Sequence, residues 1–254
     1  PSIVYSRILK SIYPDVPIIL GGIEASLRRL VHYDYWQNKL LPGMSILSPA
    51  DLIIYGMGEL PLAEVVEKLK AGADIAELRK VLQTTYAVDA QDFQPQEGDL
   101  RLFSYEECQK DKKKQAMNFK HIEEESNKFH ACRIVQPCGD RVIVVNTPFP
   151  PMTTGQIDAS FDLPYTRLPH PRYKGKTITA YEMIKHSVNL HRGCFGGCAF
   201  CTISAHQGKF VASRSEASVL KEVVAITEMD DFKGYLSDVG GPSANMYRME
   251  GVNR

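Results

Sequence analysis

The residues best suited to chemistry are three cysteines that lie within eight consecutive positions. Of the six cysteines in the chain, Cys194, Cys198 and Cys201 follow the spacing C-x-x-x-C-x-x-C. Cysteine thiolates are the usual protein ligands of iron–sulfur clusters, and nearby glycines let a short loop bend around a bulky inorganic group. Three thiolates leave one iron of a four-iron cluster without a protein ligand. The spacing therefore predicts a cluster site with one open iron.

Two other interpretations of these cysteines are open. The same spacing places them on one face of a helix, where cysteine packs as a small hydrophobic residue. Gly193, Gly196 and Gly197 argue against a helix, since each interior glycine costs roughly 1 kcal/mol relative to alanine. A structural zinc ion normally takes four ligands in two separated pairs. The sequence has no second cysteine or histidine pair of that kind, but His191 and His206 are near enough to complete a zinc site.

Size and composition restrict the class of protein. A chain of 254 residues has the length for one or two domains with a real core. Thirty basic and thirty acidic residues cancel, so no global charge attracts nucleic acid or an anionic membrane. No run of apolar residues reaches the roughly 18 that a membrane span needs, and the cysteines do not resemble a disulfide scaffold. We therefore expect a cytoplasmic protein in a reducing compartment.

The first part of the chain repeats a strand–turn–helix pattern. Residues 14–22 predict a short buried strand ending in a glycine turn, and a helix follows over 23–31. Residues 51–55 predict a second strand, and a helix follows over 61–69. The expected apolar stripe of this second helix consists of Leu62, Val65, Val66 and Leu69. Recurring units of this kind predict a Rossmann-like α/β domain over residues 1–83.

The glycine turns of these units are possible nucleotide-binding turns. Gly21 and Gly22 do not extend to a G-x-G-x-x-G pattern, and the sequence has no Walker-type glycine–lysine motif. Glu24 and Glu59 follow the two turns, where a carboxylate complements the positive end of the next helix. We therefore expect ordinary strand–helix turns here.

The middle of the chain, residues 84–180, is expected to connect the two outer domains. Residues 84–103 are polar and are expected to be irregular. Ser104 opens a capping box, which predicts a charged helix that continues to about Asn127.

A β-hairpin and a proline-rich connector complete this middle part. Residues 131–146 contain β-branched runs on both sides of Gly139–Asp140, a pair that is typical of a hairpin turn. Residues 147–175 contain six prolines, which are expected to keep the connector out of helices and inner strands.

The last part of the chain, residues 181–254, reads as one right-handed βαβ unit. Residues 187–190 predict a strand that enters the cysteine loop, a capping box predicts a helix over 213–229, and residues 234–239 predict a second strand. The expected inner face of the helix consists of Val219, Leu220, Val223, Val224 and Ile226. The second strand ends at Gly240–Gly241. Functional groups in α/β barrels sit at the carboxyl ends of strands, where both the cysteine loop and this glycine pair are expected.

The cysteine motif resembles the cluster loop of the radical SAM superfamily. The matching residues are Arg192-Gly193-Cys194-x-x-x-Cys198-x-Phe200-Cys201. The resemblance implies that the three cysteines hold a [4Fe–4S] cluster and that the open iron chelates S-adenosylmethionine (SAM). It also implies that reduction of this complex yields a 5′-deoxyadenosyl radical, with a flavodoxin or ferredoxin as the reductant. By the same resemblance, Phe200 lies against the adenine of SAM.

A second motif supports this resemblance. Gly240 and Gly241 match the start of the family's glycine–glycine–glutamate motif, whose backbone contacts the methionyl amine of SAM, and Pro242 replaces the glutamate. The run Gly-Gly-Pro-Ser-Ala-Asn-Met-Tyr from Gly240 is similar to the YgiQ-like branch of the superfamily, as is Gly-Gly-Ile-Glu-Ala-Ser-Leu-Arg-Arg-Leu from Gly21. The resemblance thus implies a Rossmann-like layer followed by the first βαβ unit of a partial TIM-type radical SAM barrel.

The amino-terminal layer is similar in plan to the cobalamin-binding domains that precede other radical SAM barrels. The cobalamin signature Asp-x-His-x-x-Gly does not occur in the sequence, so we do not predict cobalamin. Because the chain begins at Pro1 and stops abruptly at Arg254, we expect a piece of a longer protein. One βαβ unit does not complete a barrel, so this piece is expected to need the rest for activity.

The sequence therefore predicts a radical SAM enzyme segment whose substrate and reaction it does not name. The first alternative is a zinc-stabilised binding module without catalysis. The second is a scaffold that keeps the cluster but does not cleave SAM. The residues that flank the loop are candidates either for contacts with the cofactor or for structural hydrogen bonds: His191, Arg192, His206 and Arg214.

Overall fold

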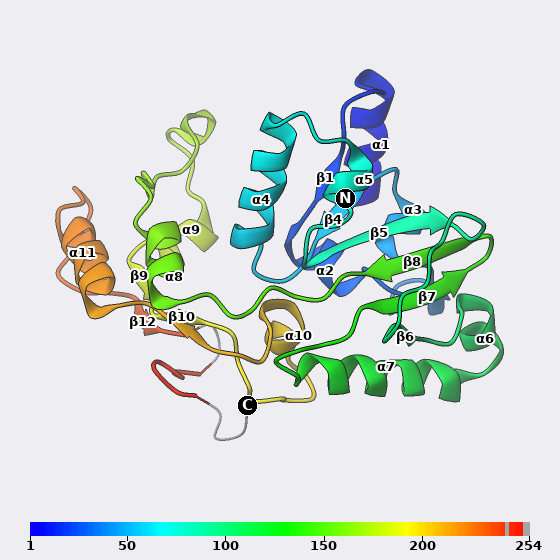
Figure 1. Ribbon diagram of the computed structural model, residues 1–254. Coiled ribbons are helices and arrows are strands. Elements are labelled where there is room, and N and C mark those ends of the chain that lie inside the picture. The colour runs from blue at the N-terminus through cyan, green and yellow to red at the C-terminus, as the bar shows by residue number, and fades with distance from the viewer. Residues whose placement is uncertain (242–243, 251–254) are drawn as a thin grey trace. The chain divides into compact units, whose positions relative to one another are not determined.

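The computed structural model describes residues 1–241 and 244–250 and divides the chain into two compact units. The first unit spans Pro1–Pro150 and the second begins at Pro151. Figure 1 shows the elements of both units. The three domain boundaries expected from the sequence, at residues 1–83, 84–180 and 181–254, stay a prediction. No helix among the described residues has the length and apolarity that a bilayer crossing requires.

The first unit is built on a mixed six-stranded sheet with the order β1-β4-β5-β8-β7-β6. The strands β1 and β4 are parallel, as are β6 and β7, whereas the pairs β4–β5, β5–β8 and β7–β8 are antiparallel. The strands are β1 (Ile19–Leu20), β4 (Leu52–Ile54), β5 (Thr84–Asp89), β6 (Leu100–Arg101), β7 (Ile134–Cys138) and β8 (Arg141–Val145). Only the pairs β1–β4 and β6–β7 are parallel, as a Rossmann-like layer would require throughout, so the observed fold is α/β with a mixed sheet.

Seven helices and a small hairpin accompany this sheet in the described part of the first unit. The helices are α1 (Ser2–Ile12), α2 (Gly22–Leu27), α3 (Met44–Leu47), α4 (Glu59–Lys70), α5 (Ile75–Leu78), α6 (Tyr105–Lys110) and α7 (Lys112–Ser126). The hairpin consists of β2 (His32–Asp34) and β3 (Lys39–Leu41), which pair antiparallel. The helix α1 was not predicted from the sequence. The strand β1 has two residues and is shorter than the strand predicted within residues 14–22.

The two strand–turn–helix units are present, but the faces of their helices differ from expectation. In α4, Pro61 and Val65 are buried, whereas Leu62 is 50% exposed. Val66 and Leu69 are partly exposed as well, so the expected stripe of four residues is wrong. The buried face of the helix is therefore narrower than expected. It consists of residues four positions apart, which lie directly above one another on a helix. The helix α2 also ends earlier than predicted, at Leu27.

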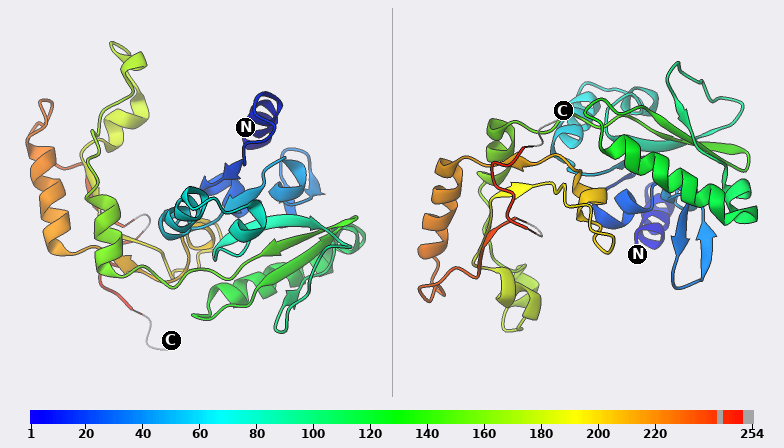
Figure 2. Two further views of the ribbon diagram at one scale, coloured as in Figure 1. Left: turned by 45° about the horizontal axis from the view of Figure 1, so that its top comes forward. Right: turned by 90° about the horizontal axis from the view of Figure 1, so that it is seen from below.

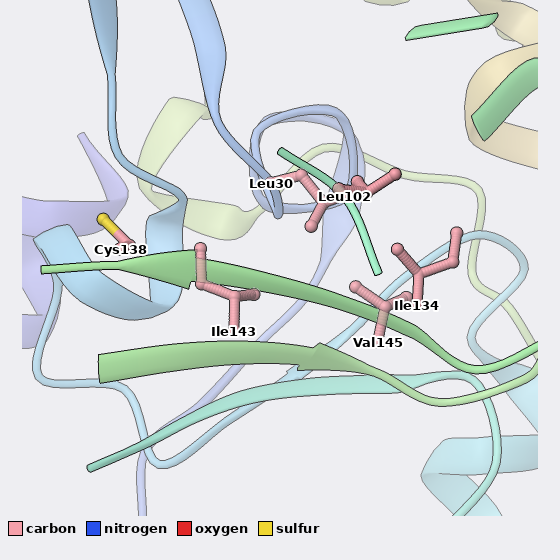
Figure 3. Close-up of a cluster of buried hydrophobic side chains, with 6 residues drawn as sticks. All are labelled: Leu30, Leu102, Ile134, Cys138, Ile143 and Val145. Carbon is pink, nitrogen blue, oxygen red and sulfur yellow. The ribbon is translucent and has the colours of Figure 1, made fainter. Parts of the chain in front are cut away.

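The predicted hairpin is confirmed, and it provides the centre of the core. In the pair β7–β8, Ile134 lies opposite Val145 and Cys138 lies opposite Arg141, with the turn at Gly139–Asp140. Its two faces contact different apolar clusters, so the sheet is covered on both sides. Figure 3 shows the cluster on one face: Leu30, Leu102, Ile134, Cys138, Ile143 and Val145.

The expectation that residues 84–103 are irregular holds for residues 90–99 but is wrong for the two strands on either side. Thr84–Asp89 forms β5, which lies between β4 and β8, and Leu100–Arg101 forms β6 at one edge. The side chains of Thr84 and Thr85 are fully buried. β-Branched residues fit a pleated strand well, and the hydroxyl of Thr84 meets its need for a hydrogen bond by donating to the carbonyl of Val81 at 2.7 Å.

The capping box at Ser104 is confirmed, but the helix that follows is interrupted. Ser104 and Glu107 exchange hydrogen bonds at the start of α6. The chain leaves the helical conformation at Asp111, whose φ is −138°, and its carboxylate then accepts a hydrogen bond from the backbone N–H of Lys113. Asp111 thus ends α6 and caps α7, so the single helix to Asn127 is two helices.

The second unit contains the predicted βαβ unit. The strands β9 (Ser187–Asn189) and β12 (Asp238–Gly240) are parallel neighbours, and α11 (Glu216–Thr227) lies between them in the chain. Val188 and Ile226 are buried where α11 packs on the strands. Leu220 and Val224 are more than half exposed, so the expected inner face of α11 is only partly right. The described residues form no closed barrel.

The remaining elements of the second unit surround this βαβ unit. They are α8 (Thr154–Phe161), η1 (Pro171–Tyr173), α9 (Thr179–Ile184), β10 (His191–Arg192), α10 (Ile203–Gln207) and β11 (Ala212–Ser213). The helix α8 lies inside the stretch that was expected to exclude helices. Thr153 and Gln156 form a capping box there, and Pro151 precedes the helix while Pro164 follows it. The prolines therefore delimit the helix and do not prevent it.

Candidate functional site

The cysteine loop follows β10 in the second unit. None of its three cysteines is in a disulfide bond. Cys194 is buried, Cys201 is half-buried and Cys198 is exposed. This gradient places one sulfur at the base of the loop and another at its solvent side. The chain is not helical across the three cysteines, so the interpretation in which they pack on one face of a helix is wrong.

Strand pairing holds the two ends of the loop together. The strands β10 and β11 are antiparallel, with His191 opposite Ser213 and Arg192 opposite Ala212. Beyond this pair, the backbone N–H of Gly193 donates to the Gln207 side-chain oxygen at 3.1 Å. The N–H of Cys194 donates to the carbonyl of Gly208, also at 3.1 Å. The loop therefore leaves and re-enters the unit at fixed points.

Two glycines in the loop differ in the space around them, and only Gly193 excludes a larger residue. Gly193 has a φ of +87°, and a β-carbon there would overlap the carbonyl oxygen of Phe210. A β-carbon on Gly196 would lie 3.4 Å from the sulfur of Cys194 and 3.7 Å from that of Cys198. Gly196 thus keeps the space between two of the thiols free of side-chain atoms.

The glycine pair lies beside the base of this loop. The register of the strands places Asn189 of β9 opposite Gly240 of β12, and the N–H of Leu190 donates to the carbonyl of Gly240 at 2.8 Å. Because β9 and β12 are parallel, their carboxyl ends meet at one edge. The cysteine loop and Gly240–Gly241 therefore lie at the same edge. Pro242, the departure from the family motif, lies outside the described residues.

His191 connects the strand before the cysteine loop to the segment after the glycine pair. Its imidazole is fully buried and lies directly against Gly241, where a β-carbon would overlap the ring. The backbone N–H of Met246 donates to its Nε2 atom at 2.9 Å. Burial lowers the pKa of His191, because the charged imidazolium would lose its hydration. His191 is therefore neutral, and its Nε2 lone pair is already occupied by a hydrogen bond.

The segment after the glycine pair is tied to β10 and β11 at further points. The hydroxyl of Tyr247 donates to the carbonyl of Arg214 at 2.9 Å, and the N–H of Arg248 donates to the Ser213 hydroxyl at 2.9 Å. The terminal carbon of Met246 lies 3.7 Å from the β-carbon position of Gly196. These contacts hold the described part of this segment against the cysteine loop.

Arg214 has a structural role in the present conformation. Its side chain is fully buried and forms an ion pair with Glu222 of α11. It also donates to the Ser218 hydroxyl at 2.8 Å and to the carbonyl of Asn189 at 2.9 Å, and its guanidinium lies 4.4 Å from the Phe161 ring centroid. Arg214 thus fastens the end of β9 to α11 and α8.

The other flanking residues lie closer to the surface. Arg192 is half-buried, and its guanidinium lies 5.1 Å from the ring centroid of Phe161. His206 is half-buried in α10, next to Gln207, which anchors the loop. Phe200 is 91% exposed, so its ring is accessible for stacking on a planar group.

The thiols have the chemistry that an iron–sulfur cluster requires, although they are not gathered around one point. Three cysteine thiols on one glycine-containing loop match the donor set of such a cluster. Among residues 1–241 and 244–250, no three His, Cys, Asp or Glu side chains are arranged to hold a metal ion. His191 is also a poor fourth zinc ligand, because its Nε2 atom already accepts the Met246 N–H.

The two acidic residues that follow the glycine turns of the first unit have structural roles. Glu24 accepts hydrogen bonds from the backbone and hydroxyl of Ser2, and chiefly this hydroxyl contact lowers the pKa of Glu24. Glu59 begins α4, as expected of a residue that complements the helix dipole. A separate open hollow of about 530 Å³ contains none of the predicted site residues. It is lined by Tyr33, Asn38, Lys39, Leu40, Cys108, Gln109, Lys112 and Gln115.

Comparison with known protein families identifies the first three quarters of the chain. A family model described as "Radical SAM N-terminal" matches residues 1–187. The match ends before the cysteine loop and the glycine pair, so it does not test the roles of those residues. No solved structure matches the chain.

Several curated proteins are similar over almost the whole chain. A UPF0313 protein from Porphyromonas gingivalis is 70% identical over all 254 residues, which cover 40% of that protein. One from Bacteroides thetaiotaomicron is 61% identical, covering 99% of this chain and 42% of that protein. One from Methanocella arvoryzae is 44% identical, covering 97% of this chain and 41% of that protein. The chain thus spans about two fifths of the length of these relatives.

Proposed function

The chain belongs to the radical SAM N-terminal family, in its UPF0313 (YgiQ-like) group, and from this premise we propose that it is part of a radical SAM enzyme. In this proposal, the thiolates of Cys194, Cys198 and Cys201 bind a [4Fe–4S] cluster. The backbone of Gly240 and Gly241 holds the methionyl part of SAM. When bound, cluster and SAM supply the one-electron reductive cleavage that yields methionine and a 5′-deoxyadenosyl radical.

One observation supports this proposal above the others. The cysteine loop and the glycine pair, about 40 residues apart in sequence, lie at the carboxyl ends of two adjacent parallel strands. Ligands of α/β folds bind outside the carboxyl ends of strands, where loops from neighbouring strands meet. A cofactor that contacts both the open iron and the glycine backbone needs this adjacency.

The residues of the chain have distinct parts in binding. Gly196 leaves room between the sulfurs of Cys194 and Cys198, so an inorganic cube can approach without a side chain in its way. His191 holds Gly241 and Met246 beside the loop. The exposed ring of Phe200 is positioned on the loop to cover the adenine from solvent. The loop closes further when all three thiolates bind, because their sulfurs are not yet gathered.

The finer architecture is also part of the proposal. The unit β9–α11–β12 is the first βαβ unit of a partial TIM-type barrel, and the first unit of the chain corresponds to the layer that precedes such barrels. The protein acts in the cytoplasm with a flavodoxin or ferredoxin as electron donor, on a substrate bound by the longer protein. The proposal includes no membrane, and the sequence does not indicate a nucleic-acid partner.

Cluster binding is tested by anaerobic reconstitution followed by iron and sulfide analysis. We expect about four irons and four sulfides per chain, a cluster stoichiometry that the triple variant C194S/C198S/C201S loses. The matched control is Cys132→Ser, because Cys132 is also a free thiol that is not fully buried, and it lies in the first unit. Its iron content should equal that of the unaltered chain.

The alternatives give different results in the same experiment. Stoichiometric zinc, or iron that survives the triple substitution, contradicts the proposal. Reductive formation of 5′-deoxyadenosine distinguishes an enzyme from a scaffold that binds the cluster but does not cleave SAM. It is measured with a protein that has the full length of the relatives, called the family-length protein below. If the cluster forms but this product does not, the metal site is supported and the catalytic role is contradicted.

A further inference from the structure

The helix α1 packs Ile3 against the core of its unit but presents its other large apolar side chains to solvent. These residues form a stripe along the helix and its C-cap, and each is between 47% and 66% exposed: Val4, Tyr5, Ile8, Leu9, Ile12 and Tyr13. Positions four apart on a helix lie above one another, so the stripe is continuous. Contiguous exposed apolar surface of this kind marks an interaction site in a folded protein. Figure 2 shows α1 at the periphery of its own unit.

The polar side of α1 faces the protein. Ser6 is buried, and its hydroxyl donates to the carbonyl of Ser2 within the helix. Arg7 donates to the carbonyl of Leu47 at 3.2 Å, and Lys10 forms an ion pair with Asp51 at 3.1 Å. A surface helix normally turns its apolar stripe inward and its charges outward. In α1 the charged residues Arg7 and Lys10 bind the protein, whereas the apolar stripe faces solvent and covers no core.

The strand next to α1 has an open edge. In the sheet order, β1 is the last strand at one end, and it pairs only with β4 among the described residues. A sheet edge offers unpaired backbone N–H and C=O groups to another strand. The helix α1 precedes β1, which is a parallel strand of the sheet. A helix in this position commonly connects two parallel strands, one of which would lie beside β1.

From these observations we infer that the stripe of α1 and the free edge of β1 together form a docking surface for an α/β segment of the longer polypeptide. The relatives are about two and a half times as long as this chain, since it covers 40% to 42% of them. The segment provides a strand that pairs parallel to β1 and apolar side chains that pack under α1. The sheet of the first unit continues through this surface.

Two other occupants fit the surface less well. A membrane-binding helix turns basic residues toward lipid head groups, but Arg7 and Lys10 are engaged with the protein. A second copy would pair through a helix of 11 residues, which is about 16 Å long. Such a helix alone buries far less than the roughly 1,200 Å² of a stable interface.

The inference is tested by hydrogen exchange of the α1 amides in two proteins, the 254-residue chain and a protein of family length. We expect exchange in residues 2–12 to be at least about tenfold slower in the longer protein, because the helix is covered there. The amides of α7 are the internal reference and should exchange equally in both. The surface lies in the first unit, so the outcome is independent of cluster binding.

A pair of variants provides a second measurement. Ile8→Glu places a charge in the stripe and should lower the melting temperature of the longer protein by several degrees, while the 254-residue chain changes little. Phe119→Glu on α7 is the matched control, because Phe119 is also a large apolar residue on a helix and is 62% exposed. It should change neither protein.

Three results would overturn the inference. In the first, α1 exchanges equally fast in both proteins. In the second, α1 is already protected in the 254-residue chain, either at all concentrations, which indicates cover by the second unit, or only at high concentration together with a dimer in sedimentation. In the third, the 254-residue chain binds vesicles of anionic phospholipid and Ile8→Glu abolishes that binding.

Discussion

The imidazole of His191 occupies the space that a side chain on Gly241 would need. The two residues are 50 positions apart, one on β10 and one directly after β12. The same imidazole accepts a hydrogen bond from the backbone of Met246. The proposed cluster loop and the proposed SAM contact therefore share one buried side chain, and a change on one side of this contact reaches the other.

Gly241→Ala should weaken SAM binding while the cluster remains. The added β-carbon overlaps the ring of His191, so the backbone of the glycine pair must shift, at a cost of about 1–3 kcal/mol in folding free energy. We expect SAM affinity, measured by calorimetry on the reconstituted family-length protein, to fall about tenfold or more, a change of about 1.4 kcal/mol. Iron content should stay near four.

Gly155→Ala is the control for this prediction. Gly155 lies in α8, and a β-carbon there has no atom within 4 Å. Its stability should change by less than about 1 kcal/mol and its SAM affinity should not change. Unaltered SAM affinity in Gly241→Ala would show that the glycine pair is not part of the SAM site.

Gly193→Ala should disrupt the base of the cysteine loop. The new β-carbon would overlap the carbonyl of Phe210, and the backbone must also keep a φ of +87° that alanine disfavours. We expect the variant to bind less than half of the iron of the unaltered chain. Gly234→Ala, outside the loop, separates the two effects, because its φ is also +87° but no atom lies within 4 Å of the new carbon. It should lose only about 1–2 kcal/mol of stability and retain its iron. Equal iron loss in both would assign the effect to backbone strain alone.

Arg214→Lys should destabilise the second unit although charge is conserved. Lysine does not reproduce the planar contacts of the guanidinium with Glu222, Ser218 and the Phe161 ring. Loss of a buried partner of this kind costs about 3–5 kcal/mol. Chemical denaturation monitored by circular dichroism measures it. The exposed Arg172→Lys is the control and should be neutral within about 0.5 kcal/mol. A neutral result for Arg214→Lys would mean that its contacts do not contribute to stability.

His32 should make the stability of the first unit depend on pH. Burial is the main cause that lowers the pKa of His32 below its usual 6.5, and neighbouring Arg28 lowers it further while Leu30 and Asp34 oppose the shift. The unfolded chain therefore takes up a proton more readily than the folded one. The contribution is complete above about pH 6.5 and is lost as the pH falls through the lowered folded-state pKa.

The check is the free energy of unfolding of the chain between pH 5 and pH 8. His32→Gln should reduce the decline on the acidic side, although the decline due to His191 remains. A profile that His32→Gln does not alter would contradict the predicted contribution.

Local sequence signals predicted local structure well. The turn residues Gly139–Asp140 between β-branched runs identified the hairpin, and Ser104 with Glu107 identified the start of α6. The capping box of Thr153 and Gln156 is an equally good signal for α8, but the surrounding prolines favour a connector without helices. Residues 84–89 contain two threonines, a tyrosine and a valine, a composition that favours the strand observed.

Long-range pairing was less predictable. A strand–turn–helix pattern indicates two elements but does not determine whether the next strand in the sheet is parallel, so the mixed sheet could not be read from residues 14–69. Asp111 interrupts a helix pattern that the charged residues on both sides would otherwise continue. The sequence placed His191 near the cysteines, but nothing in it indicated contact with Gly241.

The pairing of β10 with β11 has a thermodynamic consequence for ligand exchange. It closes residues 193–211 into a ring before any ligand is present. Ring closure of that length costs about 2–3 kcal/mol by the loop-closure relation, and folding of the unit has already met that cost. The three thiols are therefore held on one closed ring, although their sulfurs are not yet gathered around one point. If the proposed cluster binds here, a thiolate displaced by a competing ligand would stay at high effective concentration beside the vacated site, because the ring and the other two thiolates hold it there.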